Sequence, residues 1–109
     1  MAKANNNSAA GERKISDSRL TKVRQDIKSR SSQLSTWVKK VEVISNDLGN
    51  QEDTLVNRPV ITVMENDLAF YQSKADRLRK EVDSLSKTLS TYISKNSRID
   101  DKRLGIDTE

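Results

Sequence analysis

The feature that most constrains the fold is a heptad repeat of apolar residues that runs without a break in spacing from Ile61 to Ile99. Its members alternate in steps of three and four residues, and of the twelve positions in this spacing only Asn96 is polar. A repeat of seven corresponds to about 3.5 residues per turn, so the apolar seam stays on one side of a gently supercoiled helix. A seam of this length has to be covered by another helix.

A second seam with the same spacing runs from Leu20 to Leu48 and predicts a helix over residues 16–48. Ser16 or Ser18 offers a hydroxyl to cap its first turn. Gly49 directly follows the last seam residue, where a left-handed C-cap is expected. The seam residues that we expect to hold the two helices together are Leu20, Val23, Ile27, Leu34, Leu48, Leu68, Leu78, Val82, Leu85, Leu89 and Tyr92.

The connection between the helices is predicted at residues 49–59, and the second helix at residues 60–98. Pro59 suits the first turn of a helix, because its missing N–H has no partner there in any case. Thr62 and Glu65 form an alternative start as a capping box. Residues 60–63 are β-branched and also fit a short strand, but an isolated strand has nothing to pair with.

The heptad register indicates a real break between the helices. Adding sevens from Leu48 leads to Thr62, whereas the second seam is framed on Ile61, so the register slips by one residue. Helices of similar length can then fold back on each other. We expect an all-α antiparallel coiled-coil hairpin over residues 15–100, completed to a bundle by self-association or a partner, although the sequence leaves parallel pairing open. Residues 1–14 are predicted to be a disordered tail and residues 101–109 a frayed one.

Composition narrows the function classes. Hydrophobic residues make up 33% of the 109 residues, below the share of about 45–50% in globular domains. The chain has neither Cys nor His, so the commonest metal ligands and the commonest general base are missing. Carboxylates fall on exposed helix faces without a cleft to shift their pKa values. We therefore expect no enzyme, catalytic residue, metal, cofactor or small-molecule substrate.

The sequence also bears on location. It has no run of 18 apolar residues that would span a membrane. Residues 1–13 lack the apolar stretch of an ordinary signal peptide. A cytoplasmic protein is the expectation, with signal-less specialised secretion left open.

Apolar residues outside the seams gather near the predicted turn and widen the apolar surface there. A two-helix hairpin cannot bury both of its sides, so this end is expected to meet a third layer from a second copy or another helical protein. The alternative is a scatter of exposed valines, which is common on protein surfaces. The predicted partner-binding residues are Trp37, Val38, Val41, Val43, Ile44, Val60, Val63, Phe70 and Tyr71.

Two polar seam positions and one basic segment add further hypotheses. Arg30 and Asn96 are the polar members of the seams, and one interpretation is that they set the register of the helices. The alternative is that Arg30 extends its charged group from a partly open seam to water, and that Asn96 marks a frayed helix end. In an antiparallel hairpin, Glu81 would lie within reach of Arg30.

The net charge of +4 is concentrated in the basic segment Arg13–Arg30. A basic helix leading into a zipper suggests DNA binding, but the segment has no aromatic residue to stack on bases, so we favour a solvated face.

The outline of two similar helices in about 100 residues, without Cys or a signal peptide, resembles the WXG100-like hairpins of type VII secretion. In that family the Trp belongs to a Trp-x-Gly turn, whereas Trp37-Val38-Lys39 lies inside the predicted first helix here. The family also carries a C-terminal signal in which an acidic residue follows a Tyr at the fourth position, whereas Tyr92 is followed at that position by Asn96. Type III secretion needle subunits and their chaperones, and the N-terminal helical domains of membrane-fusion proteins, share the outline. The resemblance implies a small secretion-linked hairpin.

These observations predict a non-enzymatic coiled-coil protein–protein interaction module that serves as an adaptor, chaperone or subunit of a larger assembly. The alternatives are a secretion-system helical hairpin and a basic coiled-coil protein that binds nucleic acid. Of the possible partners, nucleic acid is less favoured than a helical protein.

Overall fold

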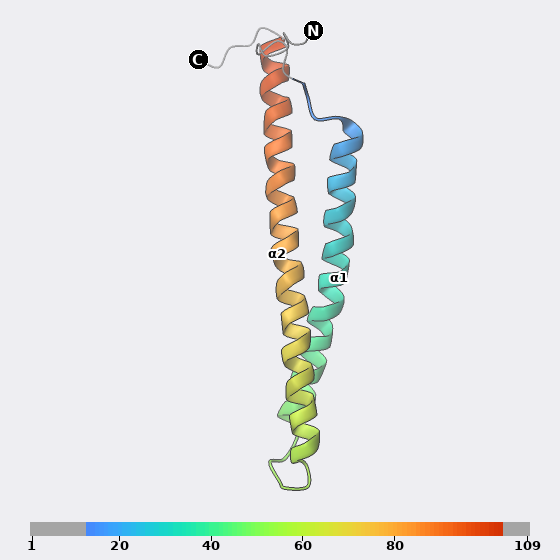
Figure 1. Cartoon of the computed structure of the whole chain (residues 1–109), viewed down its shortest axis with the longest axis vertical. Coiled ribbons are helices and arrows are strands. Elements are labelled where there is room, and N and C mark those ends of the chain that lie inside the picture. The colour runs from blue at the N-terminus through green and yellow to red at the C-terminus, as the bar shows by residue number, and fades with distance from the viewer. Residues whose placement is uncertain (1–12, 104–109) are drawn as a thin grey trace, which may run out of the picture. The chain divides into compact units, whose positions relative to one another are not determined.

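The computed structural model describes residues 13–103 of the chain, and these form two helices joined by one loop (Figure 1). Helix α1 spans Asp17–Gly49 and helix α2 spans Arg58–Arg103. The described part of the chain contains no strand, so the β-branched run at residues 60–63 is helical. The predicted all-α helical hairpin is confirmed.

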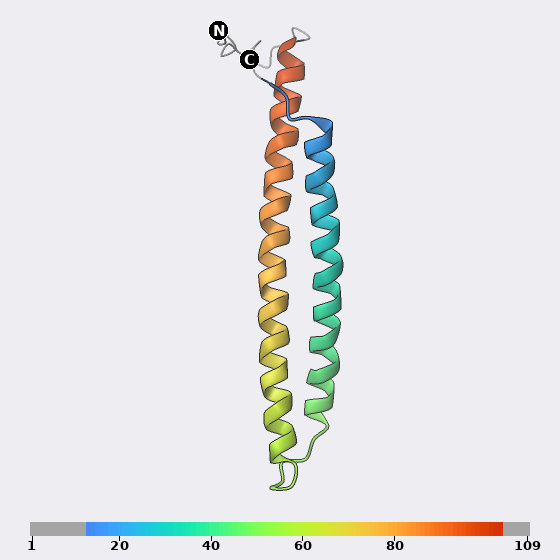
Figure 2. The same cartoon turned by 45° about the vertical axis from the view of Figure 1, so that its right-hand side comes forward.

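The chain divides into two compact units, which we describe separately. One is Ile27–Asp83, in which the second part of α1 and the first part of α2 run antiparallel on either side of the loop (Figures 1 and 2). The other combines the described parts of Met1–Asp26 and Ser84–Glu109. Most of the two predicted tails, residues 1–12 and 104–109, lies outside the described residues.

Helix α1 begins with a side-chain cap. Ser16 Oγ accepts a hydrogen bond from the backbone N–H of Arg19 at 3.1 Å, and the Ser16 carbonyl accepts from Leu20 N–H at 3.0 Å. This is the N-cap arrangement, in which a hydroxyl satisfies one of the orphan N–H groups of the first turn. Asp17 adds a negative charge at the positive end of the helix dipole. Of the two predicted capping serines, the structure uses Ser16.

The end of α1 differs from the prediction. Gly49 is the last helical residue and its φ is outside the left-handed region, so the expected left-handed C-cap is wrong. The N–H of Asn50 instead donates to the carbonyls of Asn46 and Asp47, both at 3.2 Å. A bond shared between two successive carbonyls is common at helix ends. Because it closes the last turn, no reversal of backbone handedness is needed.

The loop is residues 50–57, shorter than the predicted 49–59, and it is held by its own polar groups. Thr54 Oγ1 accepts from the N–H of Asn57 at 3.2 Å, and Asn57 Nδ2 donates to the carbonyl of Glu52 at 3.1 Å. The Asn57 carbonyl then accepts from Ile61 N–H at 2.9 Å, which is the first helical bond of α2. Helix α2 therefore begins at Arg58, two residues before the predicted start, with Pro59 in its first turn.

Helix α2 also ends later than the predicted residue 98. It continues to Arg103, because Ile99 is completely buried and Asn96 is tied to the backbone of Ile15. Lys102 and Arg103 lie in the last turn, where positive charge complements the helix dipole.

The pattern of burial agrees with both heptad seams. None of the seam residues from Leu20 to Leu48, or from Ile61 to Ile99, is fully exposed. In the unit with the chain ends, Leu20, Val23 and Ile99 are buried, and in the unit with the loop, Ala75 and Leu78 are buried. The remaining seam residues are half-buried, as expected when only one neighbouring helix covers a helical face.

Candidate functional site

The unit Ile27–Asp83 has almost no buried core. Its only buried hydrophobic residues are Ala75 and Leu78, at the end of the unit away from the loop. No residue between Ile27 and Lys74 is buried, although this stretch carries two apolar seams. Seam residues that stay half-exposed retain apolar surface in contact with water, which favours association with a further layer.

Several large apolar side chains on the same unit are more exposed still. Val43 is 60% exposed, Val60 52%, Val63 58% and Phe70 53%. All four were predicted as partner-binding residues. Of the other predicted residues, Trp37, Val38, Val41, Ile44 and Tyr71 are half-buried.

Two exposed apolar residues of the loop were not among the predicted partner-binding residues. Leu55 is 81% exposed and Val56 is 85% exposed. The signal was present as an adjacent pair of apolar residues in a connection that is otherwise polar, from Gln51 to Arg58. The loop uses its polar side chains for its own hydrogen bonds, which leaves this pair directed to solvent.

Three aromatic rings form a cluster between α1 and α2. The Trp37 ring meets Phe70 edge-on, with 6.0 Å between centroids and 82° between planes, and lies 5.6 Å from Tyr71. Such edge-on pairs add a modest attraction beyond the buried area. Lys40 Nζ lies 5.7 Å from the centroids of both Trp37 and Tyr71, and Lys74 Nζ lies 5.4 Å from that of Phe70. Cations at these distances are attracted to the ring faces.

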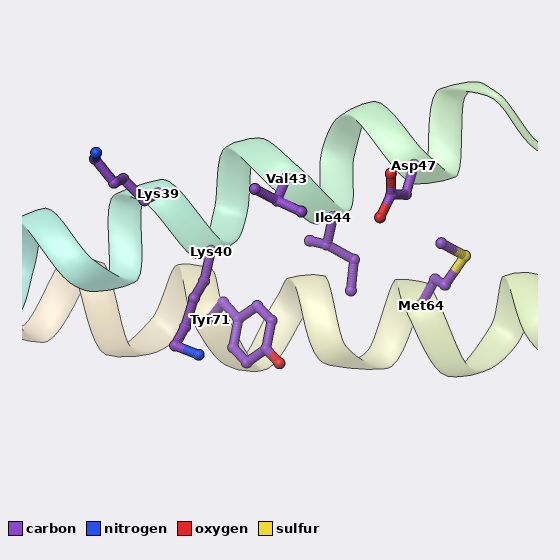
Figure 3. Close-up of a pocket in the computed structure, with 7 residues that line it drawn as sticks. All are labelled: Lys39, Lys40, Val43, Ile44, Asp47, Met64 and Tyr71. Atoms are coloured by element: carbon purple, nitrogen blue, oxygen red, sulfur yellow. The ribbon is translucent and has the colours of Figure 1, made fainter.

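A groove of about 340 Å³ lies beside this cluster (Figure 3). Its floor is apolar and comes from both helices, with Ile44 on α1 and Met64 and Tyr71 on α2. Asp47 lies at the end nearer the loop, and Lys40 lies beside Tyr71 at the other end (Figure 3). The full lining is Lys39, Lys40, Val43, Ile44, Asp47, Met64 and Tyr71.

The exposed apolar residues share one flank of the seams. Val43, Val63 and Phe70 each directly precede a seam residue, namely Ile44, Met64 and Tyr71. At about 100° per residue they therefore lie on the same side of their helix. We call this surface the turn-half face and define it as Val43, Val60, Val63 and Phe70 together with the groove. Val38 follows a seam residue instead and lies on the opposite flank.

The polar seam residue Arg30 forms the ion pair expected from an antiparallel hairpin. Its Nε lies 2.8 Å from Glu81 Oε1, and the two side chains are 39% and 41% exposed. Arg77 approaches the other oxygen of Glu81 at 3.9 Å. This contact confirms the predicted pairing of Arg30 with Glu81 and, with it, the antiparallel register of this unit.

The basic segment is partly neutralised by neighbouring groups. In the unit with the chain ends, Lys14 pairs with Asp100 at 2.8 Å and Lys22 with Asp26 at 2.7 Å. Arg19 lies over the ring of Tyr92 at 5.1 Å from its centroid. These contacts occupy side chains that a nucleic-acid site would direct at phosphates.

Residues 13–103 contain no group of three or more acidic side chains placed to hold a metal ion. Within the same range, neither α1 nor α2 is long and apolar enough to cross a membrane. No protein-family model, curated protein or solved structure matches the chain.

Proposed function

We propose that this chain is a non-enzymatic coiled-coil interaction module whose hairpin supplies two helices to a larger helical bundle. One observation carries the proposal: between Ile27 and Lys74 no residue is buried, while Val43, Val60, Val63 and Phe70 are more than half exposed. Covering such side chains contributes about 1.5–3 kcal/mol for each one fully removed from water. The third layer is a helical protein surface, because the face it covers is a helical groove.

In this proposal the module is an adaptor, chaperone or subunit of an assembly in the cytoplasm. The aromatic cluster of Trp37, Phe70 and Tyr71 is the centre of the contact, since aromatic side chains dominate the energetics of interfaces. Lys40 and Asp47 provide charges at the groove that restrict which partner and which orientation fit. A secretion-linked hairpin would use the same face in a different setting.

The nucleic-acid alternative receives less support from the described contacts. Lys14, Lys22 and Arg30 each pair with a carboxylate. Binding through this segment would lose affinity steeply as the salt concentration rises. Absent or salt-independent binding would eliminate this alternative.

The proposal is tested by thermal unfolding of the purified chain, followed by circular dichroism over a hundredfold range of protein concentration, with light scattering on the same samples. We expect either a Tm that rises with concentration together with an oligomer mass, or a weakly helical monomer whose partner is missing. A helical monomer that unfolds cooperatively at a high, concentration-independent Tm would show that the hairpin satisfies itself and would contradict the proposal.

A further inference from the structure

We infer that the partner of the turn-half face is a second copy of this chain, packed antiparallel to the first, with Lys40 of each copy opposite Asp47 of the other. The inference rests on the proposed function, because it names the partner of the same face. It concerns only the unit Ile27–Asp83.

The first argument is charge. Lys40 and Asp47 both line the groove on α1 and lie seven residues apart, about 10.5 Å along the helix, so they cannot pair with each other. Among the described residues, neither forms an ion pair: Lys40 lies over two aromatic rings and Asp47 has no cationic partner. Two opposite charges, equally spaced about one point on a face, are the arrangement that a two-fold axis turns into two identical ion pairs.

The second argument is apolar matching about the same point. The midpoint between Lys40 and Asp47 falls beside Val43, so the axis places Val43 against its own symmetry mate. Across the groove, Lys40 is level with Tyr71 and Asp47 with Met64 (Figure 3), which puts the axis near Leu68 of α2. Phe70 lies two residues from that level, whereas Val60 lies eight residues away toward the loop. The axis therefore brings the exposed Phe70 of one copy beside the exposed Phe70 of the other.

The antiparallel arrangement also separates like charges. The loop end of the unit carries Asp47, Glu52 and Asp53, of which Asp53 is paired with Arg58 at 3.5 Å, whereas Lys39, Lys40 and Lys74 lie further from the loop. A parallel copy would set the acidic ends side by side. An antiparallel copy sets each acidic end against the lysines, and complementary charge is what fixes orientation at such a surface.

Charge exchange tests the ion pair. Lys40→Glu and Asp47→Lys should each weaken the dimer by at least about tenfold, because each places like charges opposite one another in two symmetric positions. The double variant Lys40→Glu/Asp47→Lys restores both pairs and should return the dimer Kd to within about threefold of the original, a residual of less than 1 kcal/mol. Sedimentation at about 0.1 M salt measures the Kd, where screening leaves close pairs effective. A double variant that is as weak as the worse single variant would overturn the inference.

Disulfide trapping tests the axis, and the chain has no native Cys to interfere. Val43→Cys should form a covalent dimer under mild oxidation, because the axis brings the two positions within the roughly 4.4–6.8 Å between Cα atoms that a disulfide needs. The control Gln72→Cys, two residues after Phe70, is exposed on the opposite side of α2 and should stay monomeric under the same conditions. Cross-linking of Val43→Cys to Phe70→Cys in a mixture, without self-cross-linking of either, would indicate a parallel copy and overturn the inference.

The oligomeric state separates this inference from the proposed function. A weakly helical monomer at all concentrations would overturn self-pairing but leave a module that needs a different protein. A stable, helical monomer would overturn both.

Discussion

The side-chain amide of Asn96 binds both polar backbone groups of Ile15. Asn96 Oδ1 accepts a hydrogen bond from the Ile15 N–H at 2.7 Å, and Asn96 Nδ2 donates to the Ile15 carbonyl at 3.0 Å. Ile15 precedes the first turn of α1, so no helical bond satisfies these groups. An ion pair of Lys14 with Asp100 lies beside this contact. Asn96 therefore anchors the entry to α1, and its interpretation as a frayed end is wrong, since α2 continues to Arg103.

Replacing Asn96 by Ala should release the segment before α1. Two partly buried hydrogen bonds are lost and the backbone of Ile15 is left without these partners, so we expect the free energy of unfolding to fall by about 1–2 kcal/mol. Urea unfolding measures the loss, and amide exchange at Ile15 should accelerate. Asn66→Ala, at an exposed position of α2, is the control and should change the stability little. Unchanged exchange at Ile15 would show that Asn96 does not hold it.

The cap of α1 can be tested with a matched pair of serines. Ser16→Ala removes the hydroxyl that accepts from Arg19 N–H, and loss of an N-cap costs about 1 kcal/mol. Ser18→Ala, two residues later and already helical, should be neutral or slightly stabilising because Ala has the higher helix propensity. Thermal unfolding of the two variants at one protein concentration provides the comparison. Equal effects would contradict the assignment of Ser16 as the cap.

The ion pair between Arg30 and Glu81 should show a small but measurable coupling. Both side chains are partly exposed, so a double-mutant cycle to Ala is expected to give about 0.5–1 kcal/mol. The coupling should shrink when salt is raised to about 1 M, where the screening length falls to about 3 Å. The control cycle pairs Arg30 with Glu42, which lies about 18 Å away along α1 and should behave additively. A coupling that is zero at low salt would remove this pair as a determinant of register.

Trp37 and Phe70 touch each other but should contribute differently. Trp37 belongs to the seam and contacts both Phe70 and Tyr71, so Trp37→Ala is expected to loosen the fold, with a loss of about 2–4 kcal/mol and of helix content. Phe70 is 53% exposed, so Phe70→Ala should keep most of the helix content and mainly weaken association. Circular dichroism and light scattering on the same samples separate the two effects. An equal fall in Tm for both variants would refute this division.

The sequence by itself determined the two helices and the residues that face inward. Both seams are visible in the order of residues because a heptad spacing is a local property, set by the geometry of a single helix. The register slip after Leu48 likewise predicted a break, and Arg30 was correctly matched with Glu81 once an antiparallel hairpin was assumed. Apolar residues such as Val43 and Phe70 were also found from the sequence, since they fall outside the seam.

Tertiary structure decided what depends on residues far apart in the chain or on competing hydrogen bonds. Asn96 and Ile15 are 81 positions apart, so no local pattern could reveal their contact. The start of α2 depends on the Asn57 carbonyl within a loop that folds on its own side chains, and the end of α1 on a hydrogen bond shared between two carbonyls. The exposure of Leu55 and Val56 follows from that loop, because its polar groups satisfy one another and leave the apolar pair outside.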